Sequence, residues 1–293
     1  MHSVSFRYPP EGACVIVAPP APMHASRVPT RPADARERRA IEGRQRMTVD
    51  FSVVIPARYG SSRLPGKPLA DIAGRPMIAW VHERAVASGA AEVLVATDDE
   101  RIAAACRAFG ARVELTGEHH ASGTDRISEV ASRLGWSDEH IVVNVQGDEP
   151  MLPPRLVSQA AELLAADSDA SIATLTTPIE LERELTDPGV VKVVADRTGR
   201  ALYFSRAPIP WLREGERAAA PRRQVGLYAY RVGGLKVLSA EPPCALEIAE
   251  RLEQLRALWI GQRVIVADAL ERPPRGVDTE EDLAAGRELV ESA

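Results

Sequence analysis

Three cationic side chains lie close together in one loop that is rich in glycine and serine. They are Arg58, Arg63 and Lys67. Small residues let a backbone approach a ligand closely, and its N–H groups can point at anionic oxygens. The loop is therefore predicted to bind a polyphosphate, whereas the alternative is an ordinary basic turn on the surface. It is not a Walker A loop, because five residues separate Gly60 from Gly66 where that motif has four.

Two acidic positions have the chemistry of a Mg²⁺ site. Asp148 lies in residues 146–150, QGDEP, directly after an apolar run, and carboxylates are the hard oxygen ligands that Mg²⁺ prefers. The alternative role of Asp148 is to cap the helix expected from residue 153. Asp278 lies in residues 276–283, GVDTEEDL, where an aspartate before a helix with acids in its first turn is ordinarily a cap.

Two charged residues of the second half of the chain have two interpretations each. Arg206 ends the segment 203–206, YFSR, and a guanidinium can hold a carboxylate through two parallel hydrogen bonds. The alternative for Arg206 is a surface position at the end of a strand. Glu253 falls within a periodic helix, where a solvated helix face is the simpler interpretation.

The first 166 residues contain a regular alternation of strands and helices. Strands are predicted at 51–55, 92–97, 112–115 and 141–146, and helices at 77–87, 98–109, 124–134 and 153–166. Asp98 is expected to cap the second helix. Such an alternation is typical of a parallel, doubly wound sheet with helices on both faces. Ligands bind beyond the carboxyl ends of such strands, so Arg58, Asp98 and Gln146 are expected to converge on one edge.

The second half is less regular and predicts a smaller lobe with a mixed sheet. Strands are expected at 171–177, 190–195, 201–205, 225–232 and 264–267, and helices at 246–259 and 279–290. Residues 213–223 are charged and predict a loop. We expect this lobe to belong to the same domain as the first half.

Composition excludes several classes of protein. Charged residues make up 26% of the 293 residues and apolar residues 45%, as in a soluble globular protein. No apolar run reaches the roughly 18 residues that a membrane-spanning helix needs, so no membrane partner is expected. The three cysteines, Cys14, Cys106 and Cys244, form no CxxC pair. This sparse, odd set favours a reducing compartment over a disulfide framework.

The segment 51–69, FSVVIPARYGSSRLPGKPL, resembles the N-terminal signature of the sugar-activating cytidylyltransferases. Among these, the sequence is most similar to the family of 3-deoxy-manno-octulosonate (Kdo) cytidylyltransferases, and the similarity extends to about residue 283. Further matching strings are HHASGTDR, QGDEP, YFSR, GLYAY, LEQLR and GVDTEEDL. The resemblance implies a three-layer α/β/α fold of the nucleotide-diphospho-sugar transferase type, with a lobe that forms a homodimer.

The resemblance also implies roles for individual residues. The implied catalytic residues are Arg58, Lys67, Asp148 and Asp278, of which Asp148 and Asp278 would hold Mg²⁺. The implied nucleotide-binding residues are Arg58, Arg63, Lys67, Ser122, Gly123, Arg126 and Gln146. The implied sugar-binding residues are Arg206, Gln224, Tyr228, Glu253 and Gln254. Gln224 stands where the family usually has a histidine, which leaves open which eight-carbon acid sugar is preferred. A related enzyme for sialic acid or an amino-substituted Kdo is the alternative, and the strings 203–206 and 252–256 favour Kdo.

The implied reaction joins CTP to Kdo, with release of diphosphate, to give the CMP-Kdo used in lipopolysaccharide synthesis. This use of the product implies a bacterial cytoplasmic enzyme. The cations would neutralise charge on the phosphates as the leaving group departs. A non-catalytic nucleotide-binding regulator is the alternative from another class. The joint presence of Arg58, Lys67, Asp148 and Asp278 argues against that alternative.

Residues 1–46 differ in composition from the rest of the chain. Their eight arginines and four acids give a net charge of +4, which leaves −9 for the remainder of a chain whose total is −5. Seven prolines and little periodic hydrophobicity predict a disordered extension, and Met47 begins the string where a family member would normally start. We expect the cytidylyltransferase domain to span 47–293 and its acidic body to repel nucleic acid.

Overall fold

The computed structural model describes residues 49–60, 64–214 and 220–291. The predicted extension 1–46 and the predicted phosphate-binding residue Arg63 lie outside these ranges.

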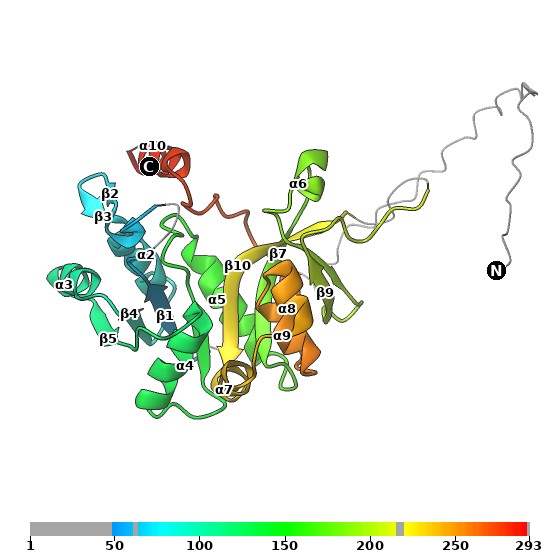
Figure 1. The fold of residues 1–293 in the computed structure, drawn as a ribbon, viewed down its shortest axis with the longest axis horizontal. Coiled ribbons are helices and arrows are strands. Elements are labelled where there is room, and N and C mark those ends of the chain that lie inside the picture. The colour runs from blue at the N-terminus through cyan, green and yellow to red at the C-terminus, as the bar shows by residue number, and fades with distance from the viewer. Residues whose placement is uncertain (1–48, 61–63, 215–219, 292–293) are drawn as a thin grey trace, which may run out of the picture. The chain divides into compact units, whose positions relative to one another are not determined.

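One mixed sheet organises the described part of the chain (Figure 1). Its main path runs in the order β11 (Val264–Asp268), β7 (Ile172–Pro178), β10 (Arg222–Arg231), β6 (Ile141–Asn144), β1 (Phe51–Ala57), β4 (Glu92–Thr97) and β5 (Arg112–Leu115). Every neighbouring pair is parallel except the two pairs that β10 makes with β6 and β7. The predicted mostly parallel, doubly wound sheet is therefore confirmed.

Two small hairpins complete the strands. The first consists of β8 (Lys192–Ala195) and β9 (Ala201–Ser205), and β8 also pairs with the start of β10. This antiparallel addition is the predicted mixed-sheet lobe. The second hairpin, β2 (Asp71–Ile72) and β3 (Arg75–Pro76), follows the short 3-10 helix η1 (Lys67–Leu69).

Helices cover both faces of the main sheet and give the predicted three layers (Figure 1). One face packs against α2 (Met77–Val86), α3 (Glu100–Ala108) and α5 (Pro154–Ala165). The other packs against α4 (Gly123–Arg133), α7 (Val232–Ala240) and α9 (Gln254–Trp259). The remaining helices are α6 (Glu182–Thr186), α8 (Ala245–Glu250) and α10 (Glu280–Glu291).

Strand β1 shows why its sequence forms a central strand. Val53, Val54 and Ile55 are all fully buried, and their branched side chains suit a pleated surface. Val53 and Ile55 belong to the core on one face and Val54 to the core on the other, as alternation along a strand requires. An apolar run without alternation therefore marks a strand that is covered on both sides.

Three sequence-based expectations about elements are wrong. Asp99, and not Asp98, caps α3 and accepts hydrogen bonds from the backbone N–H groups of Arg101 and Ile102. The single helix expected at 246–259 is two helices, α8 and α9, separated at Arg251, whose φ is 52°. The helices α6 and α7 both lie where the sequence pattern predicted no helix.

The described residues contain no helix with the length and apolar character needed to cross a bilayer. Cys106 is fully buried in α3, and burial raises the pKa of its thiol to about 12. A thiol of such high pKa is unreactive at neutral pH, which agrees with a core position.

The helix α7 provides a test of the packing on its face of the sheet. Leu235 is fully buried against the core, whereas Val237, two residues further along α7, is 53% exposed. Leu235→Ala is expected to lower the free energy of unfolding by about 2–5 kcal/mol, because it removes buried methyl groups and leaves a cavity. Val237→Ala is the matched control and is expected to change it by less than about 0.5 kcal/mol. Urea denaturation measures both, and equal effects would contradict the assigned orientation of α7.

Candidate active site

A cleft of about 890 Å³ opens beyond the carboxyl ends of the strands β6 and β7. Its walls bring together both predicted metal-binding residues, all five predicted sugar-binding residues and one predicted nucleotide-binding residue. These are Gln146, Asp148, Arg206, Gln224, Tyr228, Glu253, Gln254 and Asp278. Residues separated by more than 100 positions in the sequence thus face one space.

The acidic end of the cleft is built around Lys67. Its Nζ lies 2.7 Å from Oδ2 of Asp148 and 3.1 Å from Oδ1 of Asp278, and it also donates to the carbonyl oxygen of Val277 at 3.1 Å. Burial acts to lower the pKa of Lys67, but the two carboxylates outweigh it and the pKa is raised. The lysine is therefore held as a cation between the two predicted metal ligands.

The alternative capping roles of the two aspartates are not supported. At the start of α10, the hydroxyl of Thr279 accepts from the backbone N–H of Asp282, and Asp282 Oδ2 accepts from that of Thr279. This pair forms the cap, so Asp278 is not needed for it. At α5 the capping residue is Pro153, and no side chain caps the first turn. Asp148 instead turns toward Lys67.

Negative charge at this end exceeds what Lys67 neutralises. Burial, together with the carboxylates of Asp148 and Asp278, raises the pKa of Glu149 to about 8. Within the described ranges, no three His, Cys, Asp or Glu side chains cluster as a ready metal site. Mg²⁺, however, is commonly held by one or two carboxylates together with water and substrate phosphates. The converging oxygens of Asp148 and Asp278 fit that donor set.

The predicted nucleotide side of the site lies where β1, β4 and α4 meet. Ser122 is the capping residue of α4, and its side chain and that of Asp125 each accept the other's backbone N–H. Gly123 lies against the end of β1, because a Cβ at this position would be 3.1 Å from Cγ of Pro56. The predicted loop is thus fixed by its own backbone contacts.

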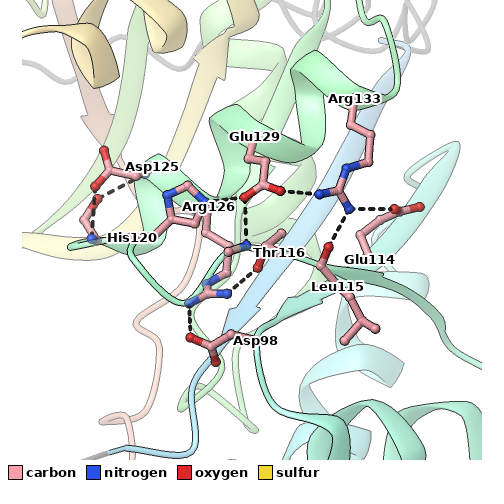
Figure 2. A network of polar contacts seen from close by, with 11 residues as sticks. Asp98, Glu114, Leu115, Thr116, His120, Asp125, Arg126, Glu129 and Arg133 are labelled. Atoms are coloured by element: carbon pink, nitrogen blue, oxygen red, sulfur yellow. Dashed lines mark hydrogen bonds and ion pairs between the residues drawn. The ribbon is translucent and has the colours of Figure 1, made fainter.

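Arg126 takes a different position from the one its predicted role suggests. Its side chain is fully buried; Nη2 lies 2.7 Å from Oδ2 of Asp98, and Nη1 donates to the hydroxyl of Thr116 (Figure 2). It therefore lies beneath the loop that carries Ser122 and ties that loop to the carboxyl end of β4.

Arg58 directly follows β1. Burial lowers the pKa of its guanidinium, the neighbouring charge of Arg126 lowers it further, and Asp98 opposes the shift. Its Nη2 is buried and has no hydrogen-bond partner among the described residues. A buried donor of this kind calls for an acceptor, as a phosphate oxygen would be.

A second set of contacts holds the segment before α4 (Figure 2). Glu129 of α4 accepts from the backbone N–H of Gly117 at 3.0 Å and contacts Nε2 of His120, and it pairs with Arg133. Burial acts to raise the pKa of Glu129, but the bonds from His120 and Gly117 outweigh it, so the pKa is lowered. The carboxylate therefore stays charged and anchors the loop at both ends.

The predicted sugar residues Gln224 and Tyr228 are presented by an irregularity in β10. Gln224 pairs with Thr176 of β7 and Tyr228 with Thr174, so four residues of β10 span two of β7. The hydroxyl of Thr174 lies 3.1 Å from the carbonyl oxygen of Val225 and 2.8 Å from that of Leu227. This hydroxyl replaces backbone partners that the bulge removes.

Glu253 and Gln254 reach the cleft because the helix is interrupted just before them. Gln254 Nε2 donates to Oε1 of Gln224 at 2.8 Å, and the carboxylate of Glu253 accepts from the hydroxyl of Thr124. Burial raises the pKa of Glu253, and the bond from Thr124 opposes this shift. The interpretation of Glu253 as part of a solvated helix face is therefore wrong.

Arg206 explains the interruption. Its Nε donates to the carbonyl oxygen of Glu250 at 2.7 Å and its Nη2 to that of Arg251 at 3.3 Å. The carboxylate of Glu250 accepts from the backbone N–H of Arg206 at 2.8 Å and from the hydroxyl of Ser205 at 2.6 Å. These bonds occupy carbonyl groups that a continuous helix would use, and so α8 ends at Glu250.

A buried lysine supports this arrangement, and sequence reasoning missed it. Lys192 is fully buried, and its Nζ donates to the carbonyl oxygens of Asp187, Val190 and Arg206. Burial lowers the pKa of Lys192, and the charge of Asp187 opposes the shift. A lysine within an otherwise apolar strand run was the available signal, because a buried ammonium requires several acceptors.

Comparisons with known proteins identify relatives over most of the chain. The cytidylyltransferase family matches residues 52–264. A 3-deoxy-manno-octulosonate cytidylyltransferase of Thioalkalivibrio sulfidiphilus is 55% identical over 248 residues, which cover 83% of this chain and 99% of the relative. The enzyme of the same name from Pseudomonas fluorescens is 56% identical over 254 residues, which cover 84% of this chain and 100% of the relative.

Two solved structures are similar to this chain, one with high and one with low sequence identity. The structure of a CMP:2-keto-3-deoxy-manno-octonic acid synthetase complexed with CTP is 45% identical in sequence to this chain and has a TM-score of 0.78. The match covers 83% of this chain and 99% of that structure. The structure of a cytidylyltransferase from Leptospira borgpetersenii is 16% identical and has a TM-score of 0.56. This match covers 84% of this chain and 88% of that structure. The second likeness concerns the fold alone.

Adjacent aspartates with different partners provide a test of this region. Asp98→Ala leaves the buried guanidinium of Arg126 without its carboxylate and is expected to cost about 3 kcal/mol of unfolding free energy. Asp99→Ala removes the cap of α3 and an exposed ion pair with Arg101, and it is expected to cost about 1 kcal/mol, because exposed ion pairs contribute little. Urea denaturation of both variants measures the difference. A larger effect at Asp99 would contradict the structural roles given to the two residues.

Proposed function

The chain belongs to the family of 3-deoxy-manno-octulosonate cytidylyltransferases, and we propose that its cleft joins CTP to Kdo to form CMP-Kdo. The observation that carries this proposal is the convergence of Asp148 and Asp278 with Gln224, Tyr228 and Gln254 in one cleft, in a chain 55% identical to such an enzyme. The product suits use in lipopolysaccharide synthesis.

The reaction is an in-line substitution at phosphorus. The C2 hydroxyl oxygen of the sugar forms a bond to the α-phosphorus of CTP, and the bond from that phosphorus to the bridging oxygen of diphosphate breaks. The hydroxyl proton leaves to solvent, and the leaving diphosphate takes up the negative charge. Catalysis of such a step depends on positioning and on cations near the phosphates.

Charged residues of this chain have separate tasks in that step. Arg58 offers the buried Nη2 to a phosphate oxygen, and Lys67 provides a fixed positive charge beside Asp148. Arg63 is proposed to join them at the triphosphate. Asp148 and Asp278 would hold Mg²⁺, which supplies charge neutralisation on the phosphates and increases the acidity of the attacking hydroxyl.

The other half of the cleft is proposed to bind the sugar. Gln224, Tyr228, Glu253 and Gln254 line it together, and the bond from Gln254 to Gln224 fixes both amides. Arg206 also lines the cleft. Three of its N–H groups donate to backbone carbonyls, of Pro188, Glu250 and Arg251. An arginine has five such groups, so those that remain are proposed to bind the sugar carboxylate.

The nucleotide base and ribose are proposed to lie against the loop that begins α4. Ser122 and Gly123 present this loop, Gln146 leaves β6 beside it, and Arg126 supports it from beneath. Arg126 is thus proposed to position the loop and not to touch the nucleotide.

We further propose a homodimer formed through the lobe of β8 and β9. Leu202 of β9, Ile248 of α8 and Trp259 of α9 are 58%, 66% and 60% exposed. These three elements are neighbours in the second half of the chain (Figure 1). Large apolar side chains gathered on neighbouring elements are typical of a surface that another copy covers.

The deciding experiment is release of diphosphate from CTP and Mg²⁺ in the presence of single acid sugars. Kdo, 8-amino-Kdo and sialic acid are compared at equal concentrations. We expect release with Kdo and at least about 100-fold lower kcat/KM with sialic acid. Release with sialic acid or 8-amino-Kdo alone would reassign the substrate, and binding of CTP without release with any sugar would favour a regulator.

Asp148 and Asp278 are expected to act as a unit. Asp148→Asn, Asp278→Asn and the double variant should each lower turnover roughly 100-fold or more, and the double variant should be no worse than the singles. Higher Mg²⁺ should restore part of the activity of the single variants, because mass action offsets weaker binding. Turnover measured against Mg²⁺ concentration checks this.

The matched control is Asp282→Asn, which removes a charge from the same motif but keeps a side-chain oxygen that can accept from the backbone N–H groups of Asp278 and Thr279. It is expected to keep turnover close to that of the unchanged protein. Near-normal turnover of Asp278→Asn at low Mg²⁺, or additive losses in the double variant, would show that no shared cation site exists.

A further inference from the structure

A second, smaller cavity of about 50 Å³ adjoins the cleft, and we call it the inner chamber. Four residues border both spaces: Gln146, Tyr228, Glu253 and Gln254. The other walls are Thr124, Asn144, Ile172, Tyr230 and Leu238. The inner chamber therefore begins at the residues proposed to bind the sugar and extends along the sheet toward α7.

Asn144 is the feature of this chamber that no role above explains. It is the last residue of β6, it is 2% exposed, and its backbone lies between those of Val54 and Tyr228 on the neighbouring strands. Its Oδ1 is buried and accepts no hydrogen bond within the described part of the chain. Buried carbonyl oxygens are nearly always paired, so this one calls for a donor from a bound molecule.

The polar groups next to Asn144 form hydrogen bonds with one another. The hydroxyl of Thr124 donates to the carboxylate of Glu253. The side chains of Thr124 and Asn144 also form hydrogen bonds with the hydroxyl of Tyr230. These contacts fix the amide of Asn144 and leave its carbonyl oxygen as the open acceptor of the chamber.

The size and the far wall of the chamber define what fits. A volume of about 50 Å³ accommodates a group of one or two heavy atoms. Ile172 and Leu238, which are 1% exposed each, give the far wall a carbon surface. A buried water needs two to four polar partners, whereas a hydroxymethyl group can place its oxygen on Asn144 and its carbon against Ile172 and Leu238. The chamber therefore offers a partner both to the oxygen and to the carbon of a CH₂OH group.

We propose that the inner chamber binds the terminal CH₂OH group of the acid sugar, whose hydroxyl donates to Oδ1 of Asn144. The proposal rests on the function proposed above and deepens it. It makes Asn144 a residue that selects the length and the end group of the sugar chain. The chamber is too small for the additional carbon of a nine-carbon sugar, so the same wall excludes the longer substrate.

The experiment compares Kdo with 8-deoxy-Kdo, the analogue that lacks the terminal hydroxyl, as substrates for the full chain with CTP and Mg²⁺. The unchanged protein is expected to favour Kdo about 100-fold in kcat/KM, because a site that pairs a hydroxyl rejects the analogue without it. In Asn144→Leu, which is nearly isosteric, the preference is expected to fall below about threefold. The KM for CTP should stay within about twofold in both proteins.

Ser52→Ala is the matched control, since it removes a buried polar group from the adjacent strand β1, where Ser52 contacts His140, away from the chamber. It should keep the preference for Kdo. If Asn144→Leu does not fold, the ratio of kcat/KM for the two sugars in the unchanged protein still tests the proposal. Equal kcat/KM for the two sugars in the unchanged protein, or an unaltered preference in a folded Asn144→Leu variant, would show that the chamber holds only water. Failure of the proposed function is a separate result, because Kdo itself would then release no diphosphate.

Discussion

The contact of one ammonium group with two carboxylates holds the active-site end of this fold together. Lys67 joins Asp148 and Asp278, which lie 81 and 211 positions away in the sequence. The backbone supports the same junction, because the N–H of Val277 donates to the carbonyl oxygen of Asp148 at 2.8 Å. A Cβ on Gly276 would lie 2.7 Å from Oε1 of Glu149. A larger residue at position 276 would therefore have to displace the side chain of Glu149, next to the predicted metal ligand Asp148.

The parts of the fold that could be predicted are those set by local chemistry. Apolar runs such as residues 51–55 predict a strand that is covered on both faces, and the alternation of strands with helices predicts a parallel sheet. The division between α8 and α9 could not be predicted, because the residue that captures the carbonyl oxygens, Arg206, lies 44 positions away. The periodicity of a sequence indicates which face of a helix is apolar. It does not indicate whether a side chain from elsewhere in the sequence will bind the carbonyl groups of that helix.

The site shows the same limit. The motifs identified Lys67, Asp148 and Gln254. In the structure Asp148 and Gln254 line one cleft, and Lys67 pairs with Asp148. The motifs did not indicate that Arg126 lies buried beneath its loop. They also did not indicate that Asp98 forms an ion pair with Arg126 and does not cap a helix. Whether a charged residue faces solvent or supports a neighbour depends on packing across the sheet, which neighbours in sequence do not reveal.

The bulge in β10 has a consequence for how this stretch can change during evolution. Because four residues of β10 span two of β7, Gln224 and Tyr228 reach the cleft from one strand, and Thr174 covers the carbonyl groups left between them. Insertion or deletion of a single residue between them would turn every later side chain of β10 to the opposite face of the sheet. That shift would reach Tyr230, which borders the inner chamber. Substitutions can thus accumulate in this segment far more readily than changes in its length.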